Sequence, residues 1–286
     1  MKFEKTYSMR SGPPSMTWDD YEALILPKWQ ALLGSKASTE ADFQAFFERH
    51  PCMIPGPFGL IGQSGHSPHP AAMISQPVLP DFTRRVPDFM WIACDSLSIY
   101  PVLIEIETPS KPWFRQDGAQ HSSLTQAREQ ITEWKMWFSE PLNVARLTKY
   151  YDIRLDGRTI RPFYVLIYGR RSEANRTNEL ATRRANLARD DEILMTFDRL
   201  TPQAGADEFF TVKVDRDGYR ALFVPPTATF GPMFAHQRAR MRDKEEAIRN
   251  SPYFSVERRQ FVLSRLDYWD DWSKGPQGIM STGDYE

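Results

Sequence analysis

Several features that would classify a protein quickly are scarce or missing in this sequence. Cysteine occurs only at Cys52 and Cys94, far apart and outside any Cys/His cluster, so neither a disulfide framework nor a zinc site is supported. No apolar run approaches the roughly 20 residues that a membrane-spanning helix needs, and the N-terminus lacks the composition of a signal peptide. These absences predict a protein of the reducing cytoplasm with no membrane contact.

A strong excess of one charge is also missing. The 36 Lys and Arg and the 37 Asp and Glu side chains leave a formal net charge of −1, so any nucleic-acid surface must be local. One local excess falls between residues 170 and 189, where six arginines stand against two glutamates. They can hold phosphates or form a solvated helix exterior, and both interpretations stay open. These arginines are Arg170, Arg171, Arg176, Arg183, Arg184 and Arg189.

The N-terminal region of the chain predicts an arm, two helices and a loop. Residues 1–16 have no periodic pattern and predict a loose arm. A helix is expected after Thr17, where Pro27 should kink or end it, and a second helix begins behind a cap at Thr39. Residues 55–80 are rich in Gly, Pro, His and Ser, which predicts an irregular loop.

The middle of the chain predicts a mixed sheet. Two apolar runs, 89–93 and 99–107, indicate a β-hairpin. Because strand side chains alternate, Glu105 and Glu107 should share one face of the second run. A helix from Ser122, a strand over 161–169, a helix over about 173–189 and a short strand over 193–197 then complete a unit with a right-handed crossover.

The pattern changes after about residue 202. A hairpin is expected over 209–224, followed by a charged helix over about 233–249 that suits a surface or a contact between copies; we expect a homo-oligomer. The tail, 275–286, is expected to be disordered. The predicted organisation is therefore an N-terminal arm and helix (1–36), a central α/β domain (37–202) and a C-terminal extension (203–286).

Acidic residues mark the ends of the predicted hairpin. Asp88 comes just before the first run, and Glu105 lies near the end of the second. Mg²⁺ prefers carboxylate oxygens and water, and a bound Mg²⁺ can stabilise a phosphoryl group in transfer and generate hydroxide. Asp88, Glu105 and the carbonyl of Ile106 could supply three ligands, which predicts an Mg²⁺ or Mn²⁺ site for phosphodiester hydrolysis. The alternative is that the acids cap strand ends and face solvent.

The same residues carry a family resemblance. Pro87-Asp88, then Glu105-x-Glu107, then a helix with Gln130 resembles the PD-(D/E)XK nuclease superfamily and, more closely, the Shedu-type antiphage nucleases. The similarity covers residues 37–202 and implies a restriction-endonuclease-like core, a central mixed sheet flanked by helices. It implies Asp88 and Glu105 as metal ligands, Gln130 as the helix residue that approaches them, and cleavage or nicking of phage DNA in bacterial defence.

One position departs from the superfamily pattern, which has a lysine where this chain has Glu107. Such a lysine helps to position or deprotonate the attacking water and balances charge in the transition state. Lys111 could reach back, Lys135 could project in from the next helix, or Glu107 could bind metal itself. Gln130 and Lys135 lie on opposite borders of the helix stripe, which favours Lys111 with Gln130. A site that has lost activity and kept only binding is a fourth interpretation.

Further candidates lie outside this set. Glu48, or in second place Glu40, could add a carboxylate from the N-terminal helix. Trp113 and its neighbours could stack on an unpaired base or pack over the sheet. Three histidines fall in predicted loops, where they can bind metal or stay solvent-exposed, and none shows a Ser/His/Asp order. They are His66, His69 and His121.

Overall fold

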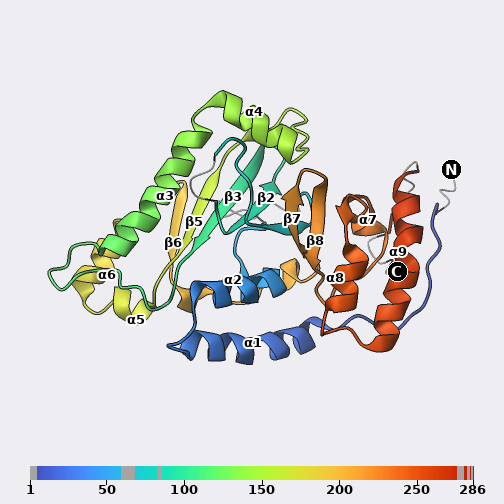
Figure 1. The fold of residues 1–286 in the computed structure, drawn as a ribbon, viewed down its shortest axis with the longest axis horizontal. Coiled ribbons are helices and arrows are strands. Elements are labelled where there is room, and N and C mark those ends of the chain that lie inside the picture. Colours follow the sequence, from blue (N-terminus) through green and yellow to red (C-terminus); the bar gives the residue numbers. More distant parts are fainter. Residues whose placement is uncertain (1–4, 59–67, 83–85, 276–279, 282–283, 285) are drawn as a thin grey trace.

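The computed structural model describes residues 5–58, 68–82, 86–275, 280–281, 284 and 286, and through these residues runs a single mixed sheet (Figure 1). The strand order is β6-β5-β3-β2-β1-β7-β8-β9, with β4 beside β3. The strands are β1 Ala72–Ser75, β2 Phe89–Cys94, β3 Ser98–Ile106, β4 Thr159–Ile160, β5 Phe163–Ile167, β6 Glu192–Met195, β7 Phe210–Asp215, β8 Gly218–Phe223 and β9 Met241–Arg242.

Helices flank this sheet, which confirms the predicted mixed α/β architecture (Figure 1). They are α1 Trp18–Gly34, α2 Glu40–Arg49, α3 Ser122–Phe138, α4 Pro141–Tyr150, α5 Arg171–Ala174, α6 Asn178–Ala185, α7 Pro232–Arg238, α8 Lys244–Asn250 and α9 Val256–Ser273. Three short 3₁₀ helices cover Pro51–Met53, Phe197–Arg199 and Ala204–Ala206. Within the described residues, no helix has the length and apolar character to cross a membrane.

Strand β3 divides the hydrophobic core into two layers. Ile104 and Ile106 pack in the cluster that contains the buried side chains of α1 and α2. Leu103 packs in the cluster that contains the buried side chains of α3. This alternation was predicted, and it follows from the two-residue period of a strand. Glu105 therefore projects on the α3 face of the sheet.

The first helix shows where packing overrides a local signal. It begins behind the predicted cap at Thr17, but it continues through Pro27 to Gly34, so the prediction that Pro27 would kink or end it is wrong. A proline inside a helix costs about 3 kcal/mol. Trp29 and Leu33 are buried beyond the proline, and their burial offsets that cost by roughly 1.5–3 kcal/mol each.

Three predicted segments are subdivided. The expected loop 55–80 contains β1, whose four buried residues pair with β2 and β7; its residues 59–67 lie outside the described residues. The expected helix 173–189 is α5 and α6, because Thr177 caps a new helix by accepting the N–H of Leu180. The expected helix 233–249 is α7, β9 and α8.

The C-terminal hairpin continues the central sheet. β7 pairs in parallel with β1, with Ala72 opposite Phe210, and β8 follows antiparallel to β7. The boundary predicted at residue 202 therefore falls within one continuous sheet. Beyond β8, helices α7 and α9 pack against each other, and α8 packs against β8 and α9.

The described residues of both termini are packed, so the loose arm and disordered tail predicted from the sequence are wrong for them. Tyr7 lies against Trp269 and Trp272 of α9. The Tyr7 hydroxyl donates to Asp284 Oδ2 at 2.5 Å. Glu286 forms a buried ion pair with Arg258, which also lies on α9. Aromatic contacts and this paired charge hold the two segments along one helix.

Candidate active site

Asp88 and Glu105 meet at the end of the β2–β3 hairpin. Phe89, which follows Asp88, pairs with Ile104, which precedes Glu105. The Asp88 N–H donates to the Ile104 carbonyl at 3.1 Å, and Asp88 Oδ2 accepts the N–H of Ile106 at 2.7 Å. Asp88 is thus hydrogen-bonded to both chain neighbours of Glu105. The structure brings together the two acids that the sequence singled out.

Both carboxylates are shielded from bulk water, Glu105 more than Asp88. Glu105 is 8% exposed, and Asp88 is half-buried. Burial raises the pKa of Asp88 to about 7; the Ile106 N–H acts in the opposite direction, and the negative charge of Glu40 raises this pKa further. An enclosed carboxylate is unfavourable without a compensating positive charge. A cation next to Asp88 would therefore stabilise this end of the hairpin.

The main chain of Ile106 offers a third oxygen. Its N–H points toward β2, since Asp88 accepts it, whereas the N–H of Glu107 points the other way and donates to Ile167 of β5 at 3.0 Å. In an antiparallel pair, the N–H and C=O of one residue face the same neighbouring strand. The Ile106 carbonyl therefore lies on the Asp88 side of β3, where the expected ligand set requires it.

Lys111 reaches back to the end of β3. Its ammonium group forms an ion pair with the Glu107 carboxylate, and Nζ lies 3.9 Å from Glu40 Oε2. The backbone makes this approach possible through a turn in which the Lys111 N–H donates to the Thr108 carbonyl at 3.2 Å. Lys111 is therefore positioned between two acids, with its side chain about one-third exposed.

Lys135, the other candidate, is engaged elsewhere. Its Nζ donates to Asp191 at 2.7 Å and to Glu192 at 3.1 Å, where β6 begins. The same ammonium group lies 5.1 Å from the centre of the Tyr164 ring on β5. These partners hold Lys135 over β5 and β6, away from Glu105 on β3. Of the two lysines, Lys111 is the one that lies at the end of β3, where it pairs with Glu107.

The sequence favoured Glu48 over Glu40 as the additional carboxylate from α2, and the structure favours Glu40. Glu48 accepts a hydrogen bond from the hydroxyl of the buried Ser75 at 2.5 Å, and Gln44 donates to the same carboxylate at 3.4 Å. Glu40, at the start of α2, is the acid whose charge acts on Asp88 and Lys111. Glu48 has a structural partner, and Glu40 is the better candidate for the site.

Helix α3 covers the sheet face that carries Glu105. Gln130 is partly buried on this helix, next to the buried Ile131. Three residues further on, Glu133 has a buried Oε2 with no hydrogen-bond partner among the described residues. Sequence reasoning missed Glu133, although its spacing of three from Gln130 puts both residues on neighbouring parts of one helix face.

Five of the six arginines between residues 170 and 189 have side-chain partners in the fold. Arg184 donates to the Asn175 side chain at 3.1 Å, and Arg189 lies 3.9 Å from a Glu192 oxygen. The Arg170 guanidinium donates to Asp198 at 2.9 Å and to the Leu33 carbonyl at 3.1 Å, which ties β5 to α1. Arg176 lies 3.4 Å from a Glu173 oxygen, and Arg183 lies 2.8 Å from a Glu179 oxygen. Exposed pairs such as these are weak, so they leave Arg176 and Arg183 able to exchange partners, whereas Arg170 is held in the fold.

A smaller cationic group remains beside α5 and α6. Burial lowers the pKa of Arg184, and the positive charges of Arg171 and Arg199 lower it further. Arg171 and Arg199 are exposed, and the Arg184 guanidinium lies 5.3 Å from the centre of the Trp113 ring. No sequence signal pointed to Arg199, because Arg199 follows β6 and lies outside the arginine-rich segment 170–189. These three arginines are the local positive surface of this region.

Trp113 itself is a core residue. It is fully buried and packs edge-on against Tyr168 with ring centres 5.3 Å apart, so the expectation that it could stack on a base is wrong. Gly169 allows this packing, because a Cβ there would lie 2.6 Å from the Trp113 indole nitrogen, at a φ of +56°. The alternative prediction, packing over the sheet, is confirmed.

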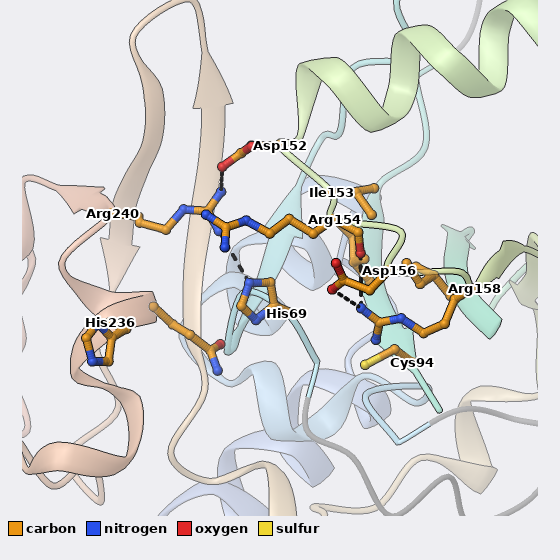
Figure 2. A pocket seen from close by; sticks show the side chains of 12 residues that line it. His69, Cys94, Asp152, Ile153, Arg154, Asp156, Arg158, His236 and Arg240 are labelled. Carbon is orange, nitrogen blue, oxygen red and sulfur yellow. Dashed lines mark hydrogen bonds and ion pairs between the residues drawn. The ribbon is translucent and has the colours of Figure 1, made fainter. Parts of the chain in front are cut away.

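The loop histidines do not join the acids. His121 caps α3 by accepting the N–H of Ser123 at 3.2 Å. His69 lines a separate cavity, shown in Figure 2, and His66 lies outside the described residues. Across the described residues, no three His, Cys, Asp or Glu side chains group closely enough to hold a metal ion. The candidate site has only two side-chain ligands, Asp88 and Glu105, and the Ile106 carbonyl and waters would complete the coordination of the metal ion. This all-oxygen donor set fits Mg²⁺ or Mn²⁺.

Comparison with known proteins identifies the family of this region. No curated protein sequence matches the chain. A family model described as Shedu protein SduA, C-terminal, matches residues 37–201, which is more than half of the 286 residues and includes Asp88, Glu105 and Lys111. The chain therefore belongs to the Shedu family, and this membership suggests a role in Shedu antiphage defence.

Proposed function

We propose that this protein is a metal-dependent DNA endonuclease that nicks or cuts phage DNA in the bacterial cytoplasm. The observation that carries the proposal is the arrangement of Asp88, Glu105 and the Ile106 carbonyl around one end of the β2–β3 hairpin. A central mixed sheet flanked by helices surrounds this arrangement, and the Shedu match covers the same region.

Asp88 and Glu105 would hold Mg²⁺ or Mn²⁺ together with the Ile106 carbonyl. The bound ion would act as a Lewis acid and lower the pKa of a coordinated water. Asp88 is oriented by the Ile106 N–H, which leaves its other oxygen available for a ligand. The raised pKa of Asp88 means that the free carboxyl binds a proton below about pH 7, so protons and metal would compete for it.

Lys111 would supply the positive charge that the superfamily pattern has at the position of Glu107. The Glu107 carboxylate holds the Lys111 ammonium group beside the end of β3, so Glu107 acts as a positioning residue for this lysine. An ammonium group at this place can orient the attacking water and offset negative charge on the phosphoryl group. Arg171, Arg184 and Arg199 would contact the DNA backbone beside the site.

Plasmid nicking tests the proposal. Purified protein with supercoiled plasmid and Mg²⁺ or Mn²⁺ should produce nicked circles, and EDTA should stop the reaction. Glu105→Ala should lower the rate by at least about 100-fold, because it removes a metal ligand. The control is Glu179→Ala, which removes an exposed carboxylate whose partner is Arg183. Absence of nicking by the wild type, or undiminished nicking by Glu105→Ala, contradicts the proposal.

A specific observation also supports a second function, a catalytically inactive module that binds nucleic acid or assembles with other copies. Lys111 is paired with Glu107, and this ion pair would keep the ammonium group from the reacting phosphate if it persisted on binding. Calorimetry with Mg²⁺ separates the two functions. DNA binding without metal uptake favours the inactive module, whereas metal uptake that Glu105→Ala abolishes favours the nuclease.

A further inference from the structure

A cavity of about 780 Å³ opens at the other end of the β2–β3 hairpin (Figure 2). Ile92 and Cys94 reach it from the end of β2, and Ile99 reaches it from the start of β3. Glu105 lies six residue steps beyond Ile99 along β3, which corresponds to about 20 Å. The cavity is therefore separate from the candidate active site.

Three arginines from two opposite walls line this cavity. Arg154 and Arg158 belong to the loop after α4, and Arg240 follows α7. Figure 2 shows Arg154 and Arg240 extending from these walls above His69. The wall after α4 and the wall at α7 are joined directly, because Arg240 donates to Asp152 at 2.8 Å.

The arginines are only partly compensated by acids. Arg240 pairs with Asp152, and Arg158 lies 3.3 Å from an Asp156 oxygen. The Arg154 guanidinium makes no hydrogen bond or ion pair with any described residue. Arginine is the side chain best suited to phosphate, since its planar group donates two parallel hydrogen bonds. Arg154 is thus available to an anionic ligand without breaking a hydrogen bond or ion pair to any residue that the structure describes.

The pKa of His69 responds to the combined charge of the arginines that line the cavity. Burial lowers the pKa of the His69 imidazole, and the positive charges of Arg240, Arg158 and Arg154 lower it further, against a smaller opposite effect of Asp152. All three guanidinium groups therefore act at one point. Arg240 Nη1 also lies 3.4 Å from His69 Nε2. An anion above His69 would interact favourably with each arginine.

The α7 wall has a different chemistry. His236 Nε2 and Gln237 Oε1 line the cavity and are buried without a hydrogen-bond partner among the described residues. A buried polar atom without a hydrogen bond destabilises the fold, so a ligand that hydrogen-bonds to these two atoms would offset that cost. Outside α7, Ile92 and Ile99 of the β2–β3 hairpin and Ile153 after α4 add apolar surface to the cavity. Together with the polar atoms of α7, this surface suits a flat ring with polar edges more than a phosphate.

We propose that this cavity binds a nucleotide, with its phosphates on the three arginines and its base between the isoleucines and Gln237. The volume lies within the range of about 300–1,000 Å³ that is typical of small-molecule sites, well above what a single phosphate fills. The site is independent of the proposed nuclease activity. Because its walls come from the Shedu-matched region and from α7, a bound nucleotide would join the central and C-terminal regions of the chain.

Calorimetry on the full chain tests this site without reference to DNA cleavage. ATP is the probe, and adenosine and inorganic tripolyphosphate represent its two halves. ATP should bind at least about tenfold more tightly than either half, because only the whole nucleotide uses both walls. No binding of ATP, or tripolyphosphate binding as tightly as ATP, overturns the proposal.

Two variants locate the ligand. Arg154→Ala should weaken ATP binding by about tenfold or more without loss of folding, since Arg154 has no described side-chain partner. Gln237→Leu should weaken the binding of ATP and leave the affinity for tripolyphosphate unchanged. Arg216→Ala, in the exposed turn between β7 and β8, is the matched control. An ATP affinity of Arg154→Ala equal to that of the wild type overturns the proposal, and thermal unfolding checks that each variant is folded.

Discussion

The two ends of the β2–β3 hairpin collect charges of opposite sign. At one end, burial and the nearby Glu40 raise the pKa of Asp88 to about 7. At the other end, burial and three arginines lower the pKa of His69. In both places burial is the largest cause of the pKa shift, and like charge acts in the same direction as burial. Each end would be stabilised by a ligand of the opposite charge, a cation beside Asp88 and an anion above His69.

The two ends also differ in how the chain builds them. Most of the acidic end comes from one hairpin and the turn after it, since residues 88 to 111 supply Asp88, Glu105 and Lys111 and only Glu40 comes from α2. The arginine-lined cavity needs three segments that are far apart in the sequence, around residues 69, 154 and 240. Local sequence can therefore reveal the first site, whereas only the fold assembles the second.

The largest expected effect is that single substitutions abolish either DNA nicking at one end of the hairpin or ATP binding at the other, without affecting the second activity. Glu105→Gln should lower plasmid nicking by about 1,000-fold, roughly 4 kcal/mol of transition-state stabilisation, because a neutral amide is a poor metal ligand. The same variant should bind ATP with wild-type affinity. Arg154→Ala should show the reverse pattern. Nicking assays and calorimetry on both variants measure this, and a variant that impairs both activities without unfolding would break the comparison.

A smaller effect is expected from the lysine of the acidic end. Lys111→Met should lower the nicking rate by about 100-fold with little change in DNA affinity, because it removes charge compensation from the transition state. Lys111→Arg keeps the positive charge and should recover some of the rate. Lys135→Met is the control, since that lysine pairs with Asp191 and Glu192. A rate for Lys111→Met equal to the wild-type rate would exclude Lys111 from the chemistry.

The buried charge of Asp88 should appear as a pH dependence of stability in metal-free protein. Its pKa is about 7 in the folded chain and 3.8 as an ordinary side chain, so folding favours the protonated form. The stabilising contribution is fully present below about pH 4 and is lost as the pH rises toward 7, with a slope of at most about 1.4 kcal/mol per pH unit.

Asp88→Asn should flatten this region of the curve and make the metal-free protein more stable than the wild type at pH 8. Urea unfolding in EDTA between pH 4 and pH 8 measures the difference. Added Mg²⁺ should stabilise the wild type and leave the variant unchanged. Equal slopes for the two proteins would show that Asp88 is not the titrating group.

The smallest expected effect concerns His69. Arg154→Ala removes one of the positive charges that lower the His69 pKa, so this pKa should rise toward its ordinary value. Bound ATP should raise it as well, because the phosphates offset the arginines. NMR titration of the imidazole ring gives both values. If neither Arg154→Ala nor bound ATP changes the His69 pKa, the arginines lie too far from this ring to form one site with it.

Local sequence signals predicted elements whose stabilising contacts are also local. The capping box of α2 requires only Thr39 and Asp42, and both of its hydrogen bonds are present. The β2–β3 hairpin follows from two adjacent apolar runs. Local signals did not predict β1, whose four residues form a strand because β2 and β7 flank them. They also wrongly predicted a kink or an end at Pro27, because the burial of Trp29 beyond the proline stabilises the rest of the helix.

The sequence by itself determined that acids end both strands of the central hairpin and that Glu105 lies on one face, since the strand period fixes the direction of each side chain. Only the tertiary structure decided the partners of the two lysines, because Lys111 pairs with Glu107 at the end of β3 whereas Lys135 pairs with Glu192 at the start of β6. Only the tertiary structure also joined Arg154 and Arg240 around His69, since long-range strand pairing and helix packing bring these segments together.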